Sequence, residues 1–408
     1  MERRDAERLD AEDPLARFRE HFVLGDPDVI YLDGNSLGRL PIATRERLAK
    51  LLDQWGSELV GAWEEWIELP VRAGDRVGRA VVGAQPGETI ISDSTTVNLY
   101  KLAGALIDSR PGAILVPRGD FPTDRYVLEG LARSQGRELH QFDSDPVEGP
   151  LPGDVERACA HAGEVAVVVL SHVQYRSGAL ADTMAIEQAA AVPVIWDLSH
   201  SAGVAHPGAI GYAVGCTYKY LNAGPGSPSF LYVREDLQPG LRTPIQGWFG
   251  QRDQFEMERG FDPLPGVQGF LAGTPNIPAL AAIEEGARLT DEAGIGRLRA
   301  KAERLTAYLV ALYDEWLLPL GFELGSPRAP ERRGGHVSLR HPEARPICRA
   351  LIDSEKVIPD FRGPDSLRLG LPPLYTRFVD VHDGLERLRA LVESGRHREV
   401  DSARRRVT

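Results

Sequence analysis

Short β-rich runs alternate along this chain with longer segments of helical periodicity, and this alternation limits the possible folds more than any other feature. Strands that alternate with helices are usually joined in parallel, because each connecting helix packs back onto the sheet. The runs that predict strands are residues 113–116, 165–170, 193–197, 212–217 and 229–233. We therefore expect an α/β fold with a large, mostly parallel sheet.

Two segments ahead of the strands carry apolar residues at helical spacing. They are Leu48, Leu51, Leu52 and Trp55 in the first segment, and Leu99, Leu102 and Leu106 in the second. Spacings of three and four residues place each set on one face of a helix. Each set therefore predicts a helix with one buried stripe.

The sequence changes character near residue 277. Residues 279–316 read as a long helical stretch that is interrupted near Gly294 and Gly296. Beyond it, residues 336–340 and 367–369 alternate like strands of a half-buried sheet, and residues 346–355 and 379–393 have helical periodicity. We expect a large domain at residues 45–280 and a smaller α+β domain at residues 281–408, with residues 1–44 attached to the smaller domain.

The composition excludes several functional classes. With 47 Lys and Arg against 59 Asp and Glu, the formal charge is -12, which argues against a nucleic-acid partner because phosphate backbones need a basic face. The cysteines Cys159, Cys216 and Cys348 are far apart, so neither a disulfide framework nor a zinc site is expected. A charged N-terminus and short apolar runs argue against export and membrane insertion. We expect a cytoplasmic protein without a metal, nucleic-acid or membrane partner.

An acid and a lysine indicate the chemistry. The apolar run 194–196 ends in Asp197 and His200, and Lys219 follows Asp197 by 22 residues, ahead of small residues that permit close backbone approach. In parallel sheets, ligands bind at the carboxyl ends of strands. Pyridoxal 5′-phosphate (PLP) needs a lysine for its Schiff base and a carboxylate that keeps its pyridine nitrogen protonated. The pair fits PLP, although a helix-capping Asp and a surface Lys would explain it as well.

Polar or aromatic residues follow other expected strands in the same way. Ser94, Thr95 and Thr96 precede the helix near residue 97, where helix amides could hold a phosphate, although a plain N-cap has the same sequence. Phe121 and Asp124 follow the run 113–116, and Ser171 follows the run 165–170. Polar or aromatic residues thus recur at the carboxyl ends of several strands, which lie on one rim of a parallel sheet, and this recurrence favours PLP. No GxGxxG follows an expected strand and no GxxxxGK[ST] is present, which disfavours dinucleotide and nucleotide sites, and no GxSxG elbow follows an expected strand, which disfavours a Ser/His/Asp hydrolase site.

Several short blocks spread over most of the chain carry a family resemblance. They read YLDGNSLG, TTVNL, FPTD, WDLSH, YKYLNAG, QGWFG, and LRL with PLY, at residues 31–38, 95–99, 121–124, 196–200, 218–224, 246–250, and 367–369 with 373–375. Any one block could occur by chance. Together they resemble the kynureninase family, which has the aspartate-aminotransferase-like fold of the PLP enzymes (fold type I).

The resemblance implies a set of cofactor-binding residues. The main chain of Thr95 and Thr96, with Tyr218, would hold the phosphate. Phe121 would stack on the ring, and Asp197 would pair with the pyridine nitrogen. The remaining members of this set are Asp124, Ser171, His200 and Lys219, together with Trp248 and Thr274, which would reach the site across a dimer interface.

The resemblance also implies substrate-binding residues. Arg368 alternates with Leu367 and Leu369, so it points away from their face, and a bidentate guanidinium suits the substrate α-carboxylate. The other expected substrate-binding residues are Asn35, Ser36 and Trp63. A packing role beside Trp66 is the alternative for Trp63.

By the same resemblance, we expect a homodimeric cytoplasmic enzyme of tryptophan catabolism and NAD biosynthesis. It would hydrolyse L-kynurenine to anthranilate and L-alanine, with Lys219 as general base and Tyr218 as a candidate proton donor. The 3-hydroxy substrate should be less preferred, because Trp63 and Thr274 offer a ring hydroxyl little to bond with. The alternatives are a cysteine desulfurase or another fold type I lyase, which would need a reactive cysteine, and a non-catalytic PLP-binding regulator, for which no basic DNA-binding domain is present.

Overall fold

A seven-stranded sheet forms the centre of the computed structural model, which describes residues 1–257 and 260–399. Its strand order is β2-β8-β7-β6-β5-β3-β4. β8 runs antiparallel to both of its neighbours, and the other pairs are parallel. The strands are β2 (Thr89–Ser92), β3 (Ala113–Pro117), β4 (Leu139–Phe142), β5 (Val165–Ser171), β6 (Val194–Asp197), β7 (Tyr212–Gly215) and β8 (Ser229–Val233). The expected mostly parallel α/β sheet is confirmed.

The five runs expected to be strands correspond to β3 and to β5 through β8. β7 is shorter than expected, because it ends at Gly215 and the chain then turns toward Lys219. β2 and β4 were not predicted. Each has only four residues, and all residues of β4 are half-buried at the sheet edge, so neither carries a long apolar run.

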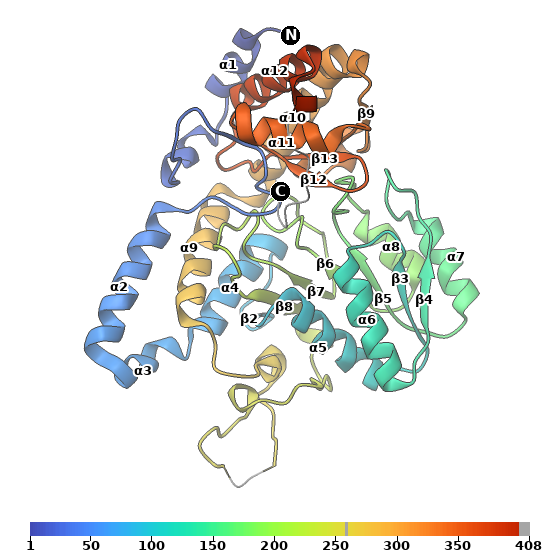
Figure 1. Ribbon diagram of the computed structural model, residues 1–408. Helices are drawn as coiled ribbons and strands as arrows, with labels where there is room; N and C mark the ends of the chain where they lie inside the picture. Colours follow the sequence, from blue (N-terminus) through green and yellow to red (C-terminus); the bar gives the residue numbers. More distant parts are fainter. Residues whose placement is uncertain (258–259, 400–408) are drawn as a thin grey trace.

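Alternate residues of the central strands face two separate cores. On β5, Val167 and Val169 lie in one core, whereas Val168 and Leu170 lie in the other. The face of the sheet that carries Val167 and Val169 is covered by helices α5 (Thr95–Asp108) and α6 (Pro122–Gln135) (Figure 1). The opposite face is covered by α4 (Leu69–Val82), α7 (Pro152–Ala162), α8 (Thr183–Ala190) and α9 (Ile277–Ala293). Burial on both faces explains why these strands are almost uniformly apolar.

The expected buried stripe of residues 99–106 is confirmed, but that of residues 48–55 is not. Of this stripe on α2 (Ile42–Glu58) only Leu51 is buried, while Leu52 and Trp55 are 57% and 58% exposed. The helix lies at the edge of the molecule, where it contacts α9 and continues toward α3 (Trp63–Trp66) (Figure 1). One chain therefore leaves most of this apolar stripe uncovered.

A second, four-stranded antiparallel sheet lies at the other end of the molecule (Figure 1). Its order is β12-β13-β10-β9, and α1, α10, α11 and α12 accompany it. The bounds are α1 (Arg3–Ala11), β9 (Glu323–Leu324), β10 (His336–Arg340), β12 (Asp360–Arg362) and β13 (Ser366–Gly370), with α10 (Ile295–Leu312), α11 (Ala344–Ser354) and α12 (Phe378–Ser394). The expected break in the long helical stretch lies at Gly294, between α9 and α10.

The N-terminal segment packs against this second sheet and its helices. β1 (Ile30–Tyr31) pairs in parallel with β11 (Val357–Ile358), and α1 contacts α12. Asp10 accepts hydrogen bonds from the backbone N–H groups of Phe378 and Val379, at 2.7 and 3.0 Å. On these contacts we propose that residues 1–44 belong to one domain with the second sheet and its helices. We place the boundary of the large domain at Gly294 and not at the expected 280, because Ala281, Ile283 and Ala287 of α9 pack in a core of the large sheet. Residues 400–408 of the expected small domain lie outside the described residues.

Within the described residues, no helix is both long and apolar enough for a membrane span.

Candidate active site

The carboxyl ends of the parallel strands bring several expected site residues together. Ser171 at the end of β5 lies beside Asp197 at the end of β6, as strand register partners. Phe121 and Asp124 open α6 directly after β3, and Lys219 follows β7. These residues come from four separate strand ends, which a parallel sheet necessarily places on one rim.

Lys219 is held by a histidine from the neighbouring strand end. Its Nζ lies 2.9 Å from Nε2 of His200. Burial lowers the pKa of His200 well below its ordinary value, and the charge of Lys219 lowers it further. The neutral ring can therefore accept a hydrogen bond from the lysine, which fixes the direction of the amine.

Three buried carboxylates, those of Asp120, Asp124 and Asp197, lie close to one another, and the last two also lie near this lysine. Burial raises the pKa of each one, that of Asp120 to about 6, and Asp197 raises the pKa of the other two further. Oδ2 of Asp124 and Nδ1 of His200 are buried without a hydrogen-bond partner. A group that carries a positive ring nitrogen and polar substituents would relieve both conditions. The residues present therefore fit PLP.

The residues expected to bind the phosphate lie at the N-terminus of α5. Ser94 is the N-cap and accepts a hydrogen bond from the Val97 N–H, so the helix begins at Thr95. The Thr95 hydroxyl lies 2.8 Å from that of Ser229 on β8, and Thr96 is exposed. The first amides of a helix have no acceptor within the helix, which suits a phosphate. The neighbouring Cys216 and then burial raise the pKa of Tyr218, so its phenol stays protonated as a donor.

Asp120 is a site residue that the sequence analysis did not identify. Its carboxylate accepts hydrogen bonds from the N–H groups of Phe121 and Ser171, at 2.9 and 2.8 Å, and from the Ser171 hydroxyl. It thereby ties the turn after β3 to the end of β5. Its position directly before Phe121 was the only available signal.

Phe121 lies against Tyr175, a second residue that was missed. The two rings meet edge to face at 5.3 Å, and Phe121 remains 38% exposed. One side of Phe121 is thus free to stack on a flat ring. The backbone carbonyl of Tyr175 accepts a hydrogen bond from Arg368, so Tyr175 links the ring-stacking residue to the expected carboxylate-binding residue.

Arg368 points away from its neighbours on β13, as their alternation predicted. Leu367 and Leu369 lie in the small-domain core, whereas the buried guanidinium of Arg368 donates from Nε to Asp360, at 2.8 Å. Asp360 also accepts from Nη1 of Arg362, at 2.7 Å, and from the Ser36 hydroxyl, at 3.2 Å. Asp360 was missed because it lies on the short strand β12, which no sequence pattern predicts.

The N-terminal segment brings the other two expected substrate residues to this place. Nη2 of Arg368 lies 3.4 Å from the Ser36 hydroxyl. Asn35 is completely buried, and neither its amide oxygen nor its amide nitrogen has a hydrogen-bond partner. The Gly38 N–H donates to the Tyr218 carbonyl, at 2.8 Å, which holds this segment against the lysine loop.

Trp63, Trp248 and Thr274 have a different environment. Trp63 and Trp248 both contact Phe249, with ring centroids 6.0 and 5.1 Å apart, and Trp63 also contacts Trp66. Trp248 is 42% exposed and Thr274 is exposed. No described contact joins these residues to Lys219 within one chain.

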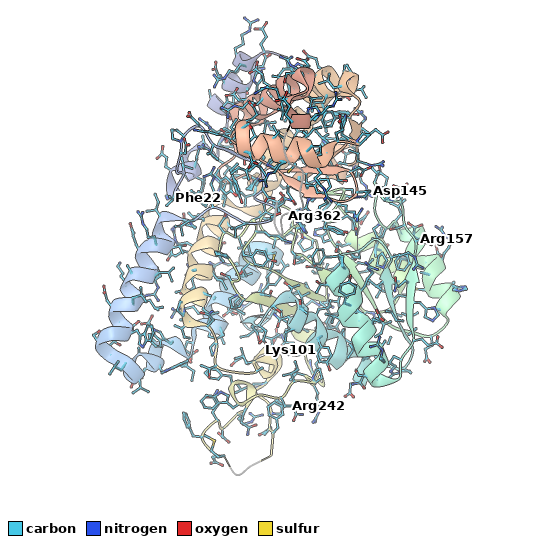
Figure 2. All side chains as sticks on the ribbon, viewed as in Figure 1. Phe22, Lys101, Asp145, Arg157, Arg242 and Arg362 are labelled. Carbon is cyan, nitrogen blue, oxygen red and sulfur yellow. The ribbon has the colours of Figure 1, made fainter. Side chains whose placement is uncertain are left out.

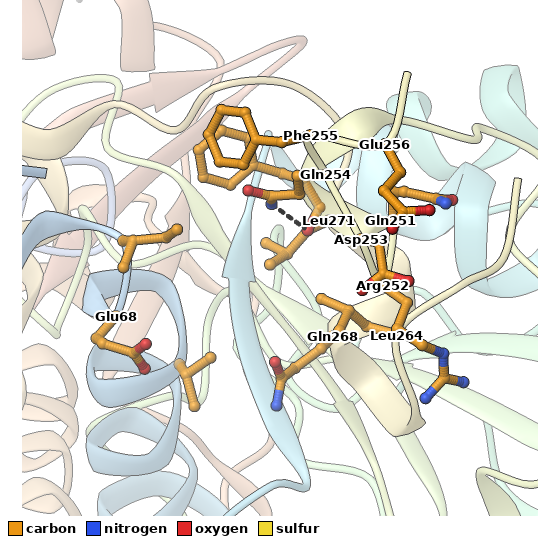
Figure 3. A pocket seen from close by; sticks show the side chains of 13 residues that line it. Glu68, Gln251, Arg252, Asp253, Gln254, Phe255, Glu256, Leu264, Gln268 and Leu271 are labelled. Atoms are coloured by element: carbon orange, nitrogen blue, oxygen red, sulfur yellow. Dashed lines mark hydrogen bonds between the residues drawn. The ribbon is translucent and has the colours of Figure 1, made fainter. Parts of the chain in front are cut away.

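A cavity of about 480 Å³ lies beside Phe249, between the start of α4 and residues 249–256 (Figure 3). Ile67, Glu68 and Phe255 are among its lining residues, and the Gln254 side chain donates to the Phe249 carbonyl at 3.4 Å. Lys219, Asp197 and Arg368 do not line it. The cavity therefore belongs to the surface around Trp248 and not to the strand-end site.

Comparisons with known proteins show which family the chain resembles. The family model described as the kynureninase C-terminal domain matches residues 298–388. The chain is 39% identical to a kynureninase from Burkholderia pseudomallei (strain K96243), over 99% of this chain and 98% of the relative. It is 38% identical to a kynureninase from Pseudomonas fluorescens, over 96% of this chain and 95% of the relative.

Solved structures show the same fold at low sequence identity. An apo cysteine desulfurase from Thermococcus onnurineus NA1 superposes with a TM-score of 0.76 at 18% identity, over 95% of this chain and 98% of the other. A C-DES mutant with glycine covalently linked to its PLP cofactor has a TM-score of 0.79 at 17% identity, over 91% and 98%. The chain thus has the aspartate-aminotransferase-like fold of PLP enzymes.

Proposed function

The chain belongs to the kynureninase family, and we propose that it hydrolyses L-kynurenine to anthranilate and L-alanine in tryptophan catabolism, with PLP as its cofactor. The observation that carries this proposal is the contact between Lys219 and His200 on the rim where β6 ends in Asp197. That contact fixes the Lys219 amine near the buried carboxylates of Asp124 and Asp197, which need a positively charged partner.

Several residues at these strand ends would hold the cofactor. Lys219 would form the covalent link, Asp197 would keep the pyridine nitrogen protonated, and Phe121 would stack on the ring. The phosphate would lie on the first amides of α5 near Thr95, with the Tyr218 phenol as a further donor. When bound, PLP supplies an electron sink for the carbanion at the substrate α-carbon.

The chain's own groups move the protons. Lys219, freed when the substrate amine takes its place, would remove the α-proton as general base. Water adds to the γ-carbonyl, the Cβ–Cγ bond breaks, and Cβ receives a proton, for which the Tyr218 phenol is the candidate donor. The products are the carboxylic acid, anthranilate, and L-alanine.

The substrate α-carboxylate would bind Arg368, beside Ser36 and Asn35. Arg368 is already oriented by Asp360 and by the Tyr175 carbonyl, so little rotamer entropy remains to be lost on binding. Trp63 would contact the aryl ring of the substrate. Its environment of Phe249 and Trp66 is apolar, which supports a preference for the unsubstituted ring.

A cysteine desulfurase activity is less well supported, because its nucleophilic cysteine would need to be exposed and of low pKa. Cys216 and Cys348 are buried, and burial raises the pKa of all three cysteines, that of Cys348 to about 12. Cys159 and Cys348 also lie within helices. The likeness to cysteine desulfurases extends to the fold alone.

We further propose a homodimer whose second copy covers the exposed apolar residues near α2. These residues are Leu52, Trp55, Leu59, Val60, Ile67, Trp248, Phe255 and Met257. Exposed apolar patches of this kind mark association sites. Trp248, which the family resemblance assigns to the site of a second subunit, lies among them. The free cysteines suit a reducing compartment, and we propose the cytoplasm.

The test is to incubate the purified, PLP-loaded protein with L-kynurenine and to follow anthranilate fluorescence. We expect anthranilate and L-alanine in equal amounts. A protein that binds PLP but forms no anthranilate would contradict the proposal. L-cysteine serves as the control substrate: alanine formed from it, and abolished when all three cysteines are replaced, would favour the desulfurase.

A further inference from the structure

Lys101 is a buried lysine in the interior of the large domain (Figure 2). It lies on α5, less than two turns beyond Thr95 and Thr96, and its side chain is 0% exposed. Burying an ammonium is costly unless it is paired and hydrogen-bonded. An apolar residue would fill this place with less cost, so the contacts of Lys101 call for an explanation.

The Nζ atom of Lys101 has three acceptors, which equals the number of donors of an ammonium group. The acceptors are Oγ of Ser92 at 2.9 Å, the backbone carbonyl of Phe270 at 2.7 Å, and Oδ2 of Asp93. Two of them directly precede the helix that carries the phosphate site, and the third comes from a segment 169 residues further along the chain. Lys101 therefore joins two separate parts of the protein.

The first part is the turn between β2 and α5. Asp93 has φ +42°, a left-handed conformation that costs energy for a residue other than glycine. The turn is held by Lys101, by the Ser92 hydroxyl, which donates to Asp93 at 2.7 Å, and by the Asn98 amide, which donates to the Ser92 carbonyl at 2.7 Å. This turn sets the direction of the first amides of α5.

The second part is the segment 247–274, which begins and ends near the residues expected in the partner's site. The Ala272 carbonyl accepts a hydrogen bond from the Phe249 N–H at 3.1 Å, and a Cβ atom on Gly247 would collide with the same carbonyl. The two ends of the segment are thus tied together at Ala272. Lys101 donates a hydrogen bond to the Phe270 carbonyl, two residues before Ala272, and so stabilises this junction.

We propose that Lys101 is a positioning residue for two active sites at once. It holds the phosphate-binding turn of its own chain, and it holds the segment that carries Trp248 and Thr274 to the site of a second copy. The proposal rests on the proposed function and homodimer. It predicts that a substitution of Lys101 weakens cofactor binding in the substituted chain. The same substitution should also weaken catalysis in the active site of the partner chain.

The first experiment measures PLP affinity of the apo protein by absorbance titration, which requires no turnover. Lys101→Met should weaken binding about 10-fold or more, because charge-assisted hydrogen bonds to the turn are lost. The matched control is Lys301→Met. Lys301 is also a buried lysine, with a carboxylate partner, Asp13, at 2.6 Å on the far domain, and its loss should lower the melting temperature while leaving PLP affinity unchanged.

The second experiment uses hybrid dimers of a Lys219→Ala chain and a Trp248→Ala chain, in which one site is intact. Adding Lys101→Met to the Lys219→Ala chain leaves the phosphate turn of the intact site untouched, but alters the segment that this chain contributes to it. We expect a further loss of about 10-fold in kcat/KM. Lys301→Met in the same chain should cause none.

Three outcomes would overturn the proposal. PLP affinity unchanged by Lys101→Met excludes the role in its own chain, and hybrid activity unchanged excludes the role in the partner site. Hybrids without any activity, before Lys101 is altered, also exclude the partner role.

Should Lys101→Met fail to fold, Asp93→Asn provides a second test of the turn, because the Asp93 side chain is partly exposed. Unchanged PLP affinity in Asp93→Asn would then overturn the role of Lys101 in its own chain. A protein that binds PLP normally but never forms anthranilate contradicts the proposed function, and the affinity experiment still decides the first role.

Discussion

The amine of Lys219 and Nε2 of His200 lie 2.9 Å apart at the carboxyl ends of neighbouring strands. This contact supports the proposal that Lys219 binds the cofactor. We expect Lys219→Ala to lose steady-state turnover and the visible absorbance of the covalently bound cofactor. The exposed Lys356, paired with Asp26 and Asp28, provides the control substitution Lys356→Ala, which should keep both. A yellow, active Lys219→Ala protein would refute the assignment.

Asp120→Asn should weaken PLP binding, because the amide nitrogen would face an N–H donor where the carboxylate now accepts three hydrogen bonds. Loss of such buried bonds should raise the Kd for PLP about 10-fold or more. If Asp120 acts partly through Ser171, the double variant with Ser171→Ala should lose less than the sum of the single effects. Asp10→Asn, which removes a carboxylate from two N–H groups elsewhere, is the control and should leave the Kd unchanged.

The uncovered face of α2 makes a prediction about assembly. Trp55→Lys should shift the protein from dimer to monomer in sedimentation experiments, since a charge would be buried in the interface. Turnover should fall together with the dimer fraction, because Trp248 and Thr274 would leave the partner's site. Leu318→Lys, at a residue of the small domain that is 52% exposed, should change neither property. A fully active monomer would contradict the shared site.

The apolar surroundings of Trp63 predict the substrate preference. A ring hydroxyl on the substrate would lose its hydration there without a partner, which costs about 1–3 kcal/mol or about 5- to 150-fold in specificity. We expect kcat/KM for L-kynurenine to exceed that for 3-hydroxykynurenine by a factor in this range. Equal values, or the reverse order, would remove Trp63 from the aryl pocket and leave the reaction class intact.

Asp33 should make the stability of the protein depend on pH. Burial, and then the charge of Asp360, raise the pKa of Asp33 from 3.8 to about 7. The folded chain therefore holds a proton that the unfolded chain releases at lower pH, so stability falls as the pH rises from about 4 to about 7. Asp33→Asn removes this dependence. The melting temperature of the variant, relative to the parent, should rise between pH 5 and pH 8, and a constant difference would contradict the assignment.

Much of the site could be predicted because its residues stand at the ends of strands. The apolar runs that form β3, β5 and β6 are visible in the sequence, and parallel strands always end on one rim. Phe121, Ser171 and Asp197 follow such runs, so their proximity required no knowledge of contacts. The alternation on β13 similarly predicted that Arg368 points away from the core of its own domain.

The sequence by itself therefore determined five of the seven strands of the large sheet and the polar residues at their carboxyl ends, because hydrophobic periodicity is a local property. Only the tertiary structure decided which face of α2 stays exposed, and which carboxylates orient Ser171 and Arg368. One acceptor of Lys101, the Phe270 carbonyl, lies 169 residues away in the chain, and the Asp120 carboxylate that binds Ser171 lies 51 residues away. Such pairings depend on how distant segments pack, and no periodic pattern encodes them, since a single buried polar residue looks the same in sequence whether it has a partner or not.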